Sequence, residues 1–135
     1  LGKAAMLRDG ADVTLAATGL MVQRAMAAAE MLAAKGVSAR VLDFHTIKPL
    51  DTEAVLAAAR ETGCIVTSEE HSVIGGLGSA VASVCAGNCP VPVVRHGVMD
   101  EFGRSGKALE VLEAYGLTAE VMAEKAMQAL ALKKG

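Results

Sequence analysis

The stretch Cys64-Ile65-Val66-Thr67-Ser68-Glu69-Glu70-His71-Ser72-Val73-Ile74-Gly75-Gly76-Leu77-Gly78-Ser79-Ala80 decides the fold, because it joins an apolar strand, a charged turn and a glycine-rich helix start. Its first three residues form an apolar run typical of a strand buried on both faces. Polar residues then begin at Thr67, which predicts a strand that ends near Glu69. Gly75 and Gly76 allow a backbone turn that residues with a Cβ resist, and the helical spacing of the apolar residues that follow predicts a helix. Its N-terminus would lie beside the carboxyl end of the strand, where open α/β sheets usually bind ligands.

The glycines at the start of this helix allow two interpretations. Gly75, Gly76 and Gly78 could expose backbone N–H groups to a bound anion, although the segment lacks the lysine and the spacing of a P-loop and does not match the dinucleotide-binding fingerprint. Close packing of the helix against the strand explains the same glycines. The sequence favours close packing and leaves the anion site open.

The charged segment Glu69-Glu70-His71 also allows two interpretations. A carboxylate beside an imidazole can orient the ring and hold its proton, so these residues could form an acid–base group. Adjacent charged residues on a loop are as often a solvated turn. Both interpretations remain open at this point.

The composition indicates one soluble domain with a substantial core. A chain of 135 residues can bury roughly two thirds of its unfolded surface, and 53% of these residues are hydrophobic. The 13 lysines and arginines and the 15 aspartates and glutamates are interspersed, which argues against a nucleic-acid footprint and a polybasic membrane patch. No apolar run approaches the roughly 20 residues needed to cross a bilayer, and the N-terminus has no signal-peptide pattern.

The three cysteines argue against a disulfide framework and favour a reducing, cytoplasmic location. Cys85 and Cys89 lie four residues apart, but no second Cys or His pair at metal-ligand spacing accompanies them. We therefore interpret Cys64, Cys85 and Cys89 as small apolar fillers. The chain begins at Leu1 without a methionine, which we interpret as the start of a processed product or, in preference, of an excised domain.

The rest of the chain alternates strands and helices. Further strands are expected at 3–8, 13–17, 39–44 and 93–98, with the first pairing back onto the second. The expected helix boundaries are N-caps at Asp51 and Thr118, stops at Gly36, Gly63 and Gly116, and a solvated Lys133-Lys134-Gly135 end. Repeated strand–helix units require a mainly parallel sheet with right-handed crossovers and helices on both faces. The sequence therefore predicts a single α/β domain over residues 1–135, with three layers in the order α/β/α.

Several stretches, taken in order, resemble one family. They are Gly10-Ala11-Asp12-Val13-Thr14-Leu15-Ala16-Ala17-Thr18-Gly19, His45-Thr46-Ile47-Lys48-Pro49-Leu50-Asp51, Glu61-Thr62-Gly63, Glu69-Glu70-His71, Gly75-Gly76-Leu77-Gly78-Ser79-Ala80-Val81, Asp100-Glu101-Phe102-Gly103-Arg104-Ser105-Gly106 and Tyr115-Gly116-Leu117-Thr118. Together they look like the C-terminal domain of transketolase, especially the form split over two subunits. The beta subunits of 2-oxo acid dehydrogenases and deoxyxylulose-phosphate synthase carry similar elements, but the stretches at 45–51 and 102–106 favour transketolase.

The resemblance implies a five-stranded, mostly parallel sheet with one antiparallel strand. It also implies transfer of a two-carbon ketol unit between sugar phosphates, in the pentose phosphate pathway, on thiamine diphosphate and a divalent metal such as Mg²⁺. In that family the cofactor is bound by other domains at a dimer interface, so we expect no catalytic, cofactor-binding or metal-binding residue and no bound cofactor on this chain alone. We expect a cytoplasmic assembly domain that joins N-terminal transketolase domains, or a subunit that carries them, in a homodimer or heterotetramer.

Two other functions remain open. One is a regulatory module that binds an anion or a nucleotide through the glycine-started helix and Arg95, His96 or Arg104. The other is the tail of a dehydrogenase beta subunit that docks a carrier-protein core.

Polar residues that follow two of the strands form a candidate contact surface for the rest of the enzyme. Because the carboxyl ends of parallel strands meet at one edge of a sheet, we expect the turn at 69–71 and the loop at 100–106 to lie together. Charge, one aromatic residue and glycines suit a polar interface with a small apolar anchor. The candidate interface or anion-contact residues are Glu69, Glu70, His71, Gly75, Gly76, Gly78, Asp100, Phe102 and Arg104.

Overall fold

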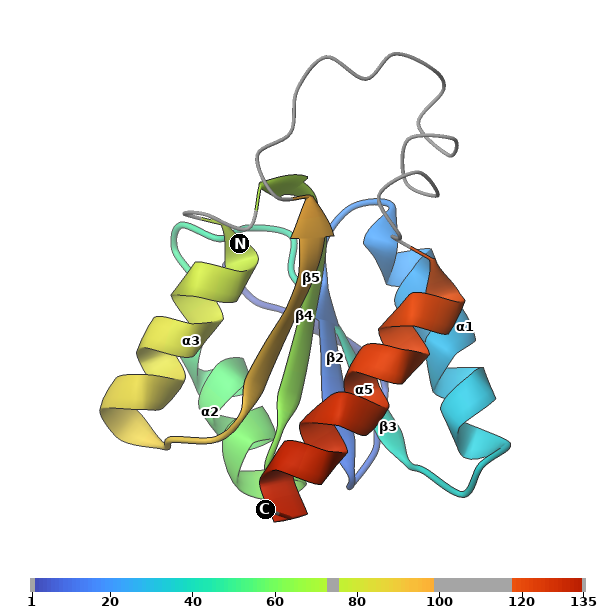
Figure 1. The fold of residues 1–135 in the computed structure, drawn as a ribbon. Helices are drawn as coiled ribbons and strands as arrows, with labels where there is room; N and C mark the ends of the chain where they lie inside the picture. Colours follow the sequence, from blue (N-terminus) through green and yellow to red (C-terminus); the bar gives the residue numbers. More distant parts are fainter. Residues whose placement is uncertain (1, 73–75, 99–117, 135) are drawn as a thin grey trace.

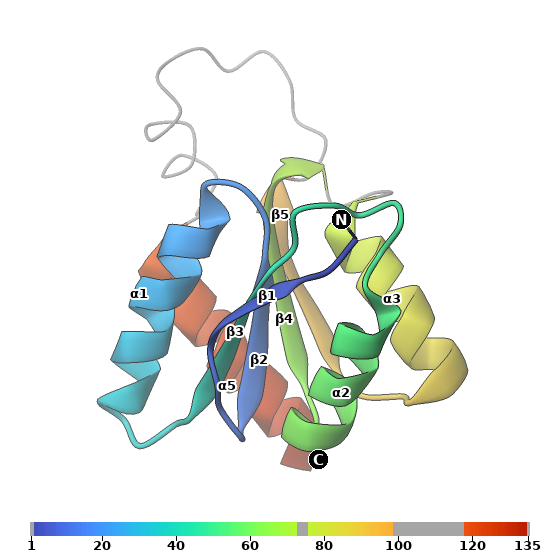
Figure 2. The ribbon, with the colours of Figure 1, turned by 180° about the vertical axis from the view of Figure 1, so that it is seen from behind.

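The structure is a computed structural model that describes residues 2–72, 76–98 and 118–134. Of residues 70–72 and of Val98 it describes the backbone alone. The described chain forms a central sheet with helices on both faces (Figure 1 and, from behind, Figure 2). The helix expected before Gly116 lies outside the described residues.

The sheet has five strands in the order β1-β3-β2-β4-β5. They are β1 (Ala5–Arg8), β2 (Val13–Ala17), β3 (Ala39–Asp43), β4 (Ile65–Ser72) and β5 (Val93–Val98). All neighbouring pairs are parallel except β1 with β3, which confirms the predicted mostly parallel sheet with one antiparallel strand. The prediction that the first strand pairs back onto the second is wrong, because β2 lies between β3 and β4 and both of its edges are occupied.

A buried arginine holds β1 beside β3. Arg40 in β3 is 5% exposed, and its Nε donates to Asp9 Oδ1 at 3.0 Å in the turn that follows β1. The same guanidinium donates to Glu61 near the end of the following helix. The Gly10 N–H and the Arg40 guanidinium together lower the pKa of the Asp9 carboxyl. These contacts join the turn after β1, β3 and α2, which are distant in the sequence.

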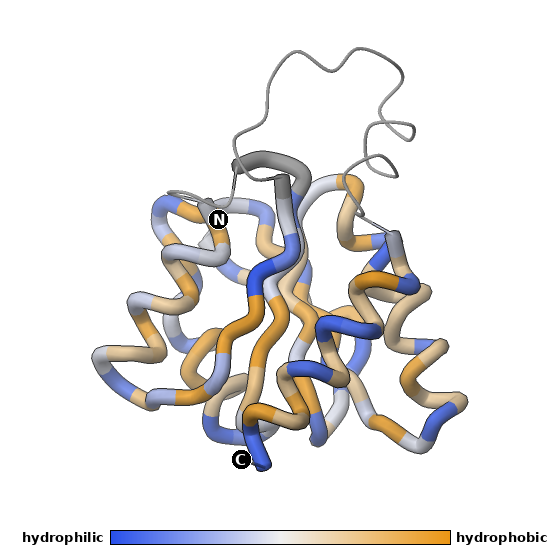
Figure 3. Tube along the Cα trace, in the orientation of Figure 1, coloured by the Kyte–Doolittle hydropathy of each residue, from blue (hydrophilic) through white to orange (hydrophobic). Residues whose placement is uncertain are grey.

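The described helices cover both faces of the sheet. The helices α1 (Met21–Ala33) and α5 (Ala119–Lys134) pack on one face, and α2 (Thr52–Thr62) and α3 (Leu77–Asn88) pack on the other (Figure 2). Side chains alternate along a strand, so β2 contributes to the cores on both faces of the sheet. Val13 and Leu15 pack in the core under α1 and α5, and Ala16 packs in the core under α2 and α3. Figure 3 shows the apolar segments running along the central strands. The predicted three-layer architecture is confirmed.

The predicted helix ends at Asp51, Gly63 and Thr118 are confirmed. Asp51 accepts the N–H of Ala54 at 3.1 Å as the N-cap of α2, and its other oxygen accepts the N–H of Ala4 at 2.8 Å. Gly63 ends α2 with φ 78°, a left-handed conformation that favours glycine. The hydroxyl of Thr118 accepts the N–H at position 121 at 3.2 Å, which caps α5. No helix in the described residues is long and apolar enough to cross a membrane.

The strand in the deciding stretch is longer than predicted. β4 continues to Ser72, so the backbone of residues 69–71 lies in the strand and not in the predicted turn. Ser68, one of the polar residues of this strand, has partners within the fold. Ser68 Oγ lies 3.0 Å from His96 Nδ1, and the Ser68 carbonyl accepts the N–H of Thr18 at 3.2 Å.

Lys133, in the predicted solvated C-terminal end, is exposed, and its side chain also makes contacts that the sequence did not indicate. Its Nζ donates to the carbonyl oxygens of Asp12 at 2.9 Å and Thr62 at 2.7 Å. Thr62 is the last residue of α2, and the final carbonyls of a helix have no partner within it. The lysine therefore caps α2 and links the end of α5 to the start of β2.

Candidate interface pocket at the carboxyl edge of the sheet

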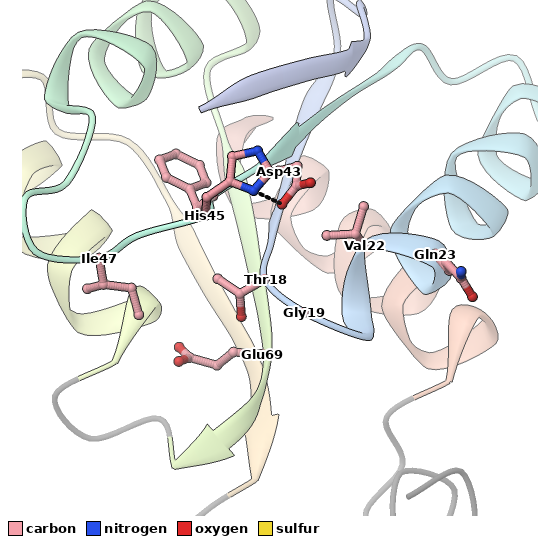
Figure 4. Close-up of a pocket in the computed structure, with 9 residues that line it drawn as sticks. Thr18, Gly19, Val22, Gln23, Asp43, His45, Ile47 and Glu69 are labelled. Carbon is pink, nitrogen blue, oxygen red and sulfur yellow. Dashed lines mark ion pairs between the residues drawn. The ribbon is translucent and has the colours of Figure 1, made fainter. Parts of the chain in front are cut away.

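A cavity of about 630 Å³ opens at the carboxyl ends of β2, β3 and β4. We call it the carboxyl-edge pocket (Figure 4). Its lining residues are Thr18, Gly19, Val22, Gln23, Asp43, Phe44, His45, Ile47 and Glu69. The helix that follows β2 covers one face of the sheet and the helix that follows β4 covers the other, so the winding direction changes between these two strands. Open α/β sheets usually bind ligands at such a switch point.

The pocket combines apolar walls with acidic groups. Val22, Phe44 and Ile47 supply the apolar part. Asp43 at the end of β3 is about one fifth exposed, and its Oδ1 lies 3.8 Å from Nδ1 of His45, which is 62% exposed (Figure 4). The described lining contains no lysine or arginine, so its charge is set by carboxylates.

Glu69 supplies the second carboxylate of the pocket. Its side chain is 3% exposed, and its Oε2 accepts the N–H of Gly78 at 2.9 Å. This bond places a carboxylate at the N-terminus of α3, where free N–H groups and the helix dipole favour an anion. The Glu69 carboxylate thus occupies the start of α3, where the anion-binding interpretation places a bound anion.

Gly76 makes room for that carboxylate. It is the N-cap of α3 with φ −97°, so the expected backbone turn that only glycine adopts is not the reason for glycine here. A Cβ at this position would lie 2.8 Å from Cδ and 2.9 Å from Oε2 of Glu69, closer than real Cβ contacts. The glycine is therefore explained by a close approach between β4 and α3.

Gly78 also supports the close-packing interpretation. A Cβ there would lie 3.0 Å from both Thr67 Oγ1 in β4 and Arg95 Cδ in β5. Arg95 is exposed and its Nη1 donates to Ser79 at 3.4 Å, on the α3 face of the sheet. His96 is 4% exposed, and successive residues of a strand point to opposite faces, so Arg95 and His96 do not converge on one site. Arg104, the third candidate of the anion-binding module, lies outside the described residues.

The structure describes only some of the residues of the predicted contact surface. Glu69 lines the carboxyl-edge pocket, and Gly76 and Gly78 lie at the adjoining helix start. Glu70 and His71 lie in β4 by their backbone. The other four candidates, at 75, 100, 102 and 104, lie outside the described residues. The expectation that the two segments form an interface stays a prediction.

Sequence reasoning missed four polar residues of the pocket: Thr18, Gln23, Asp43 and His45. A signal existed for two of them. Thr18 and Asp43 stand where β2 and β3 end, and the rule that placed Glu69 at the ligand-binding edge applies equally to them.

The cysteines and the described acidic residues offer no metal centre. Within residues 2–72, 76–98 and 118–134, no three His, Cys, Asp or Glu side chains are arranged to hold a metal ion. Cys64 and Cys85 are buried free thiols, and burial raises the pKa of both. This suits the role of small apolar fillers.

Comparisons with known proteins agree on one family. The family model for "Transketolase, C-terminal domain" matches residues 2–122. The 6-deoxy-6-sulfo-D-fructose transketolase subunit SqwH of Clostridium sp. (strain MSTE9) is 56% identical over 120 residues, which cover 89% of this chain. A 1-deoxy-D-xylulose-5-phosphate synthase of Symbiobacterium thermophilum is 42% identical over 134 residues, which cover 98% of this chain. The solved structure described as "Split gene transketolase, inactive beta4 tetramer" matches 98% of this chain with a TM-score of 0.93 and 50% identity.

The chain spans only part of each of these proteins. It covers 37% of the length of the sulfofructose transketolase subunit, 20% of the synthase and 43% of the chain in the solved structure. More than half of each relative therefore lies beyond the segment that this chain resembles.

Proposed function

The chain belongs to the transketolase C-terminal domain family, and from this premise we propose that it is the assembly domain of a thiamine-diphosphate-dependent transketolase. The complete enzyme would transfer a two-carbon ketol unit between sugar phosphates. The observation that carries the proposal is the match to a split-gene transketolase over 98% of the chain with a TM-score of 0.93.

The described residues do not fit the cofactor, so the proposal assigns the chemistry to other parts of the enzyme. A diphosphate requires cationic or N–H donors, yet the carboxyl-edge pocket offers the carboxylates of Asp43 and Glu69. The start of α3 already binds Glu69. We propose that thiamine diphosphate and Mg²⁺ are held by the N-terminal transketolase domains, or by a subunit that carries them, which we call the companion part. This chain would contribute stability and contacts, without a catalytic residue.

The partners follow from the same proposal. The chain would join the companion part in a homodimer or heterotetramer, in the cytoplasm. The sulfofructose transketolase subunit is named for 6-deoxy-6-sulfo-D-fructose, so a test of substrates extends beyond the sugars of the pentose phosphate pathway.

A second candidate is the corresponding domain of a deoxyxylulose-phosphate synthase, which the 42% identity over 98% of the chain favours. The two candidates differ in the reaction of the complete enzyme. A synthase condenses pyruvate with an aldehyde, whereas a transketolase moves a ketol unit from a ketose.

The test uses this chain with its companion part, thiamine diphosphate and Mg²⁺. Xylulose 5-phosphate and 6-deoxy-6-sulfo-D-fructose serve as ketose donors with ribose 5-phosphate or glyceraldehyde 3-phosphate as acceptor, and pyruvate serves as the alternative donor. Turnover with a ketose donor is the expected result. Turnover with pyruvate and the aldehyde acceptor, but with neither ketose donor, would replace the proposal by the synthase function.

A further inference from the structure

We propose that the carboxyl-edge pocket binds a guanidinium group, delivered by an arginine side chain of the companion part. The charge and shape of the pocket determine what it can bind, and these are properties of this chain alone. Only the source of the arginine rests on the proposed function.

The charge of the pocket selects a cation. Among the described lining residues, Asp43 and Glu69 carry carboxylates and none is a lysine or an arginine. A sugar phosphate or another anion placed there would face both carboxylates. A guanidinium presents five N–H donors in a planar fork that matches carboxylate oxygens, and it is more weakly hydrated than an ammonium.

The shape of the pocket suits a side chain with an apolar stem and a charged end. Val22, Phe44 and Ile47 supply apolar side chains to the same lining as the carboxylates of Asp43 and Glu69. Arginine lays its methylene groups along apolar surface while its guanidinium reaches polar partners. A small inorganic cation would leave these apolar walls without contact.

Glu69 is held in place before any ligand arrives. The 2.9 Å bond from the Gly78 N–H fixes its Oε2, and the side chain is 97% removed from solvent by the surrounding chain. A carboxylate accepts about four hydrogen bonds, so this one bond leaves acceptor positions for a guanidinium. Thr18 lies beside it in the pocket (Figure 4). A group that is already oriented loses little conformational freedom on binding, which favours affinity.

The rim of the pocket indicates a protein as the source of the arginine. Leu20, directly after Gly19 of the lining, is a large apolar residue that is 43% exposed. Arginine is enriched at the centres of protein interfaces, where apolar contacts surround the charged group and exclude water. More than half of each relative's length lies outside the segment matched here, so the companion part is large enough to cover this edge.

The binding chemistry is tested by NMR titration of the ¹⁵N-labelled chain with N-acetyl-L-arginine amide. We expect saturable shifts of the amide resonances of Thr18, Gly19 and Asp43. N-acetyl-L-citrulline amide has the same shape without the charge and should bind at least about tenfold more weakly, which corresponds to about 1.4 kcal/mol. Equal binding of the two probes, or shifts that cluster elsewhere, would overturn the proposal.

Two variants make this test specific. Asp43→Asn keeps the size of the side chain and should weaken binding of the arginine probe about fivefold or more, because a charged acceptor is lost. Glu30→Gln removes an exposed carboxylate from α1, outside the pocket, and should leave binding unchanged. Equal effects of the two variants would mean that net charge, not the pocket, attracts the probe.

The source of the arginine is tested in the complex with the companion part. If an arginine of that part fills the pocket, the arginine probe no longer shifts the pocket resonances after assembly, and Asp43→Asn raises the half-saturating concentration of the companion part. A pocket that still binds the probe in the complex would refute the proposed source and leave a free guanidinium compound as the ligand. Because neither readout depends on turnover, failure of the ketol-transfer function would be seen separately.

Discussion

Replacement of Gly76 by alanine tests the contact on which the start of α3 depends. The backbone at this position, with φ −97°, is accessible to alanine, so any cost must come from the new Cβ. That atom would lie 2.8 Å from Glu69 Cδ and 2.9 Å from Oε2, which forces the buried carboxylate to move. Movement breaks its bond to the Gly78 N–H. Hydrogen bonds to charged groups contribute about 1.5–3 kcal/mol, and we expect a loss of this size in the free energy of unfolding.

Urea unfolding followed by circular dichroism measures the effect, and Gly87→Ala is the matched control. Gly87 lies in the same helix, and a Cβ there meets nothing within 4 Å. Alanine is favoured over glycine inside a helix by roughly 0.5–1 kcal/mol, so the control should be stabilised. If Gly76→Ala is as stable as Gly87→Ala, the close approach does not constrain this position.

A double-mutant cycle then assigns the cost to Glu69. In a Glu69→Ala background the carboxylate is absent, so adding Gly76→Ala should cost less than about 0.5 kcal/mol. A full and undiminished cost in that background would refute the reasoning, since the clash would then involve another group.

Three further predictions concern the ends of the elements and the interface. Lys133→Met removes two hydrogen bonds to backbone carbonyls and should lower the free energy of unfolding by about 1 kcal/mol, whereas Lys134→Met should change it by less than about 0.5 kcal/mol in the same urea titration. Burial alone would raise the pKa of the Asp51 carboxyl, but hydrogen bonds from N–H donors, led by Ala4, outweigh burial and lower the pKa. The stability that this carboxylate contributes is therefore present above pH 4 and is lost as the pH falls through the folded-state pKa. Asp51→Asn should therefore reduce the loss of stability measured between pH 5 and pH 2, and an unchanged acid profile would argue against this carboxylate. His71→Ala and Phe102→Ala should each weaken association with the companion part by about 1–3 kcal/mol while leaving thermal unfolding of the chain nearly unchanged, as seen in parallel binding and melting experiments.

The sequence was sufficient for the elements whose signals are local. The strands at 13–17 and 93–98 begin and end as predicted, because buried apolar runs are bounded there by turn residues. The cap at Asp51 depends on the residue type and its position before a helix, both visible in the chain.

The features that the sequence could not supply depend on contacts between distant segments. The pairing of β1 with β3 is accompanied by the contact between Arg40 and Asp9, which lie 31 residues apart. The role of Lys133 depends on carbonyls 121 and 71 residues away. Neither distance leaves a periodic pattern in the chain.

The sequence predicted the location of the candidate site but not all of its residues. Its place at the carboxyl edge and the participation of Glu69 follow from the alternation of strands and helices. The strand order β3-β2-β4 does not follow from local pattern, so the sequence could not indicate which loops meet. The pocket unites Asp43 with Glu69, and the predicted contact of Glu69 with the segment at 100–106 stays a prediction.

The most direct test of the assembly role is a titration of ketol transfer against the concentration of this chain. The companion part is held at a fixed concentration with thiamine diphosphate, Mg²⁺ and saturating sugar substrates. We expect no turnover from the chain alone and a saturable rise in activity as the chain is added to the companion part. Turnover by the chain alone, or companion activity that does not change when the chain is added, would contradict the account.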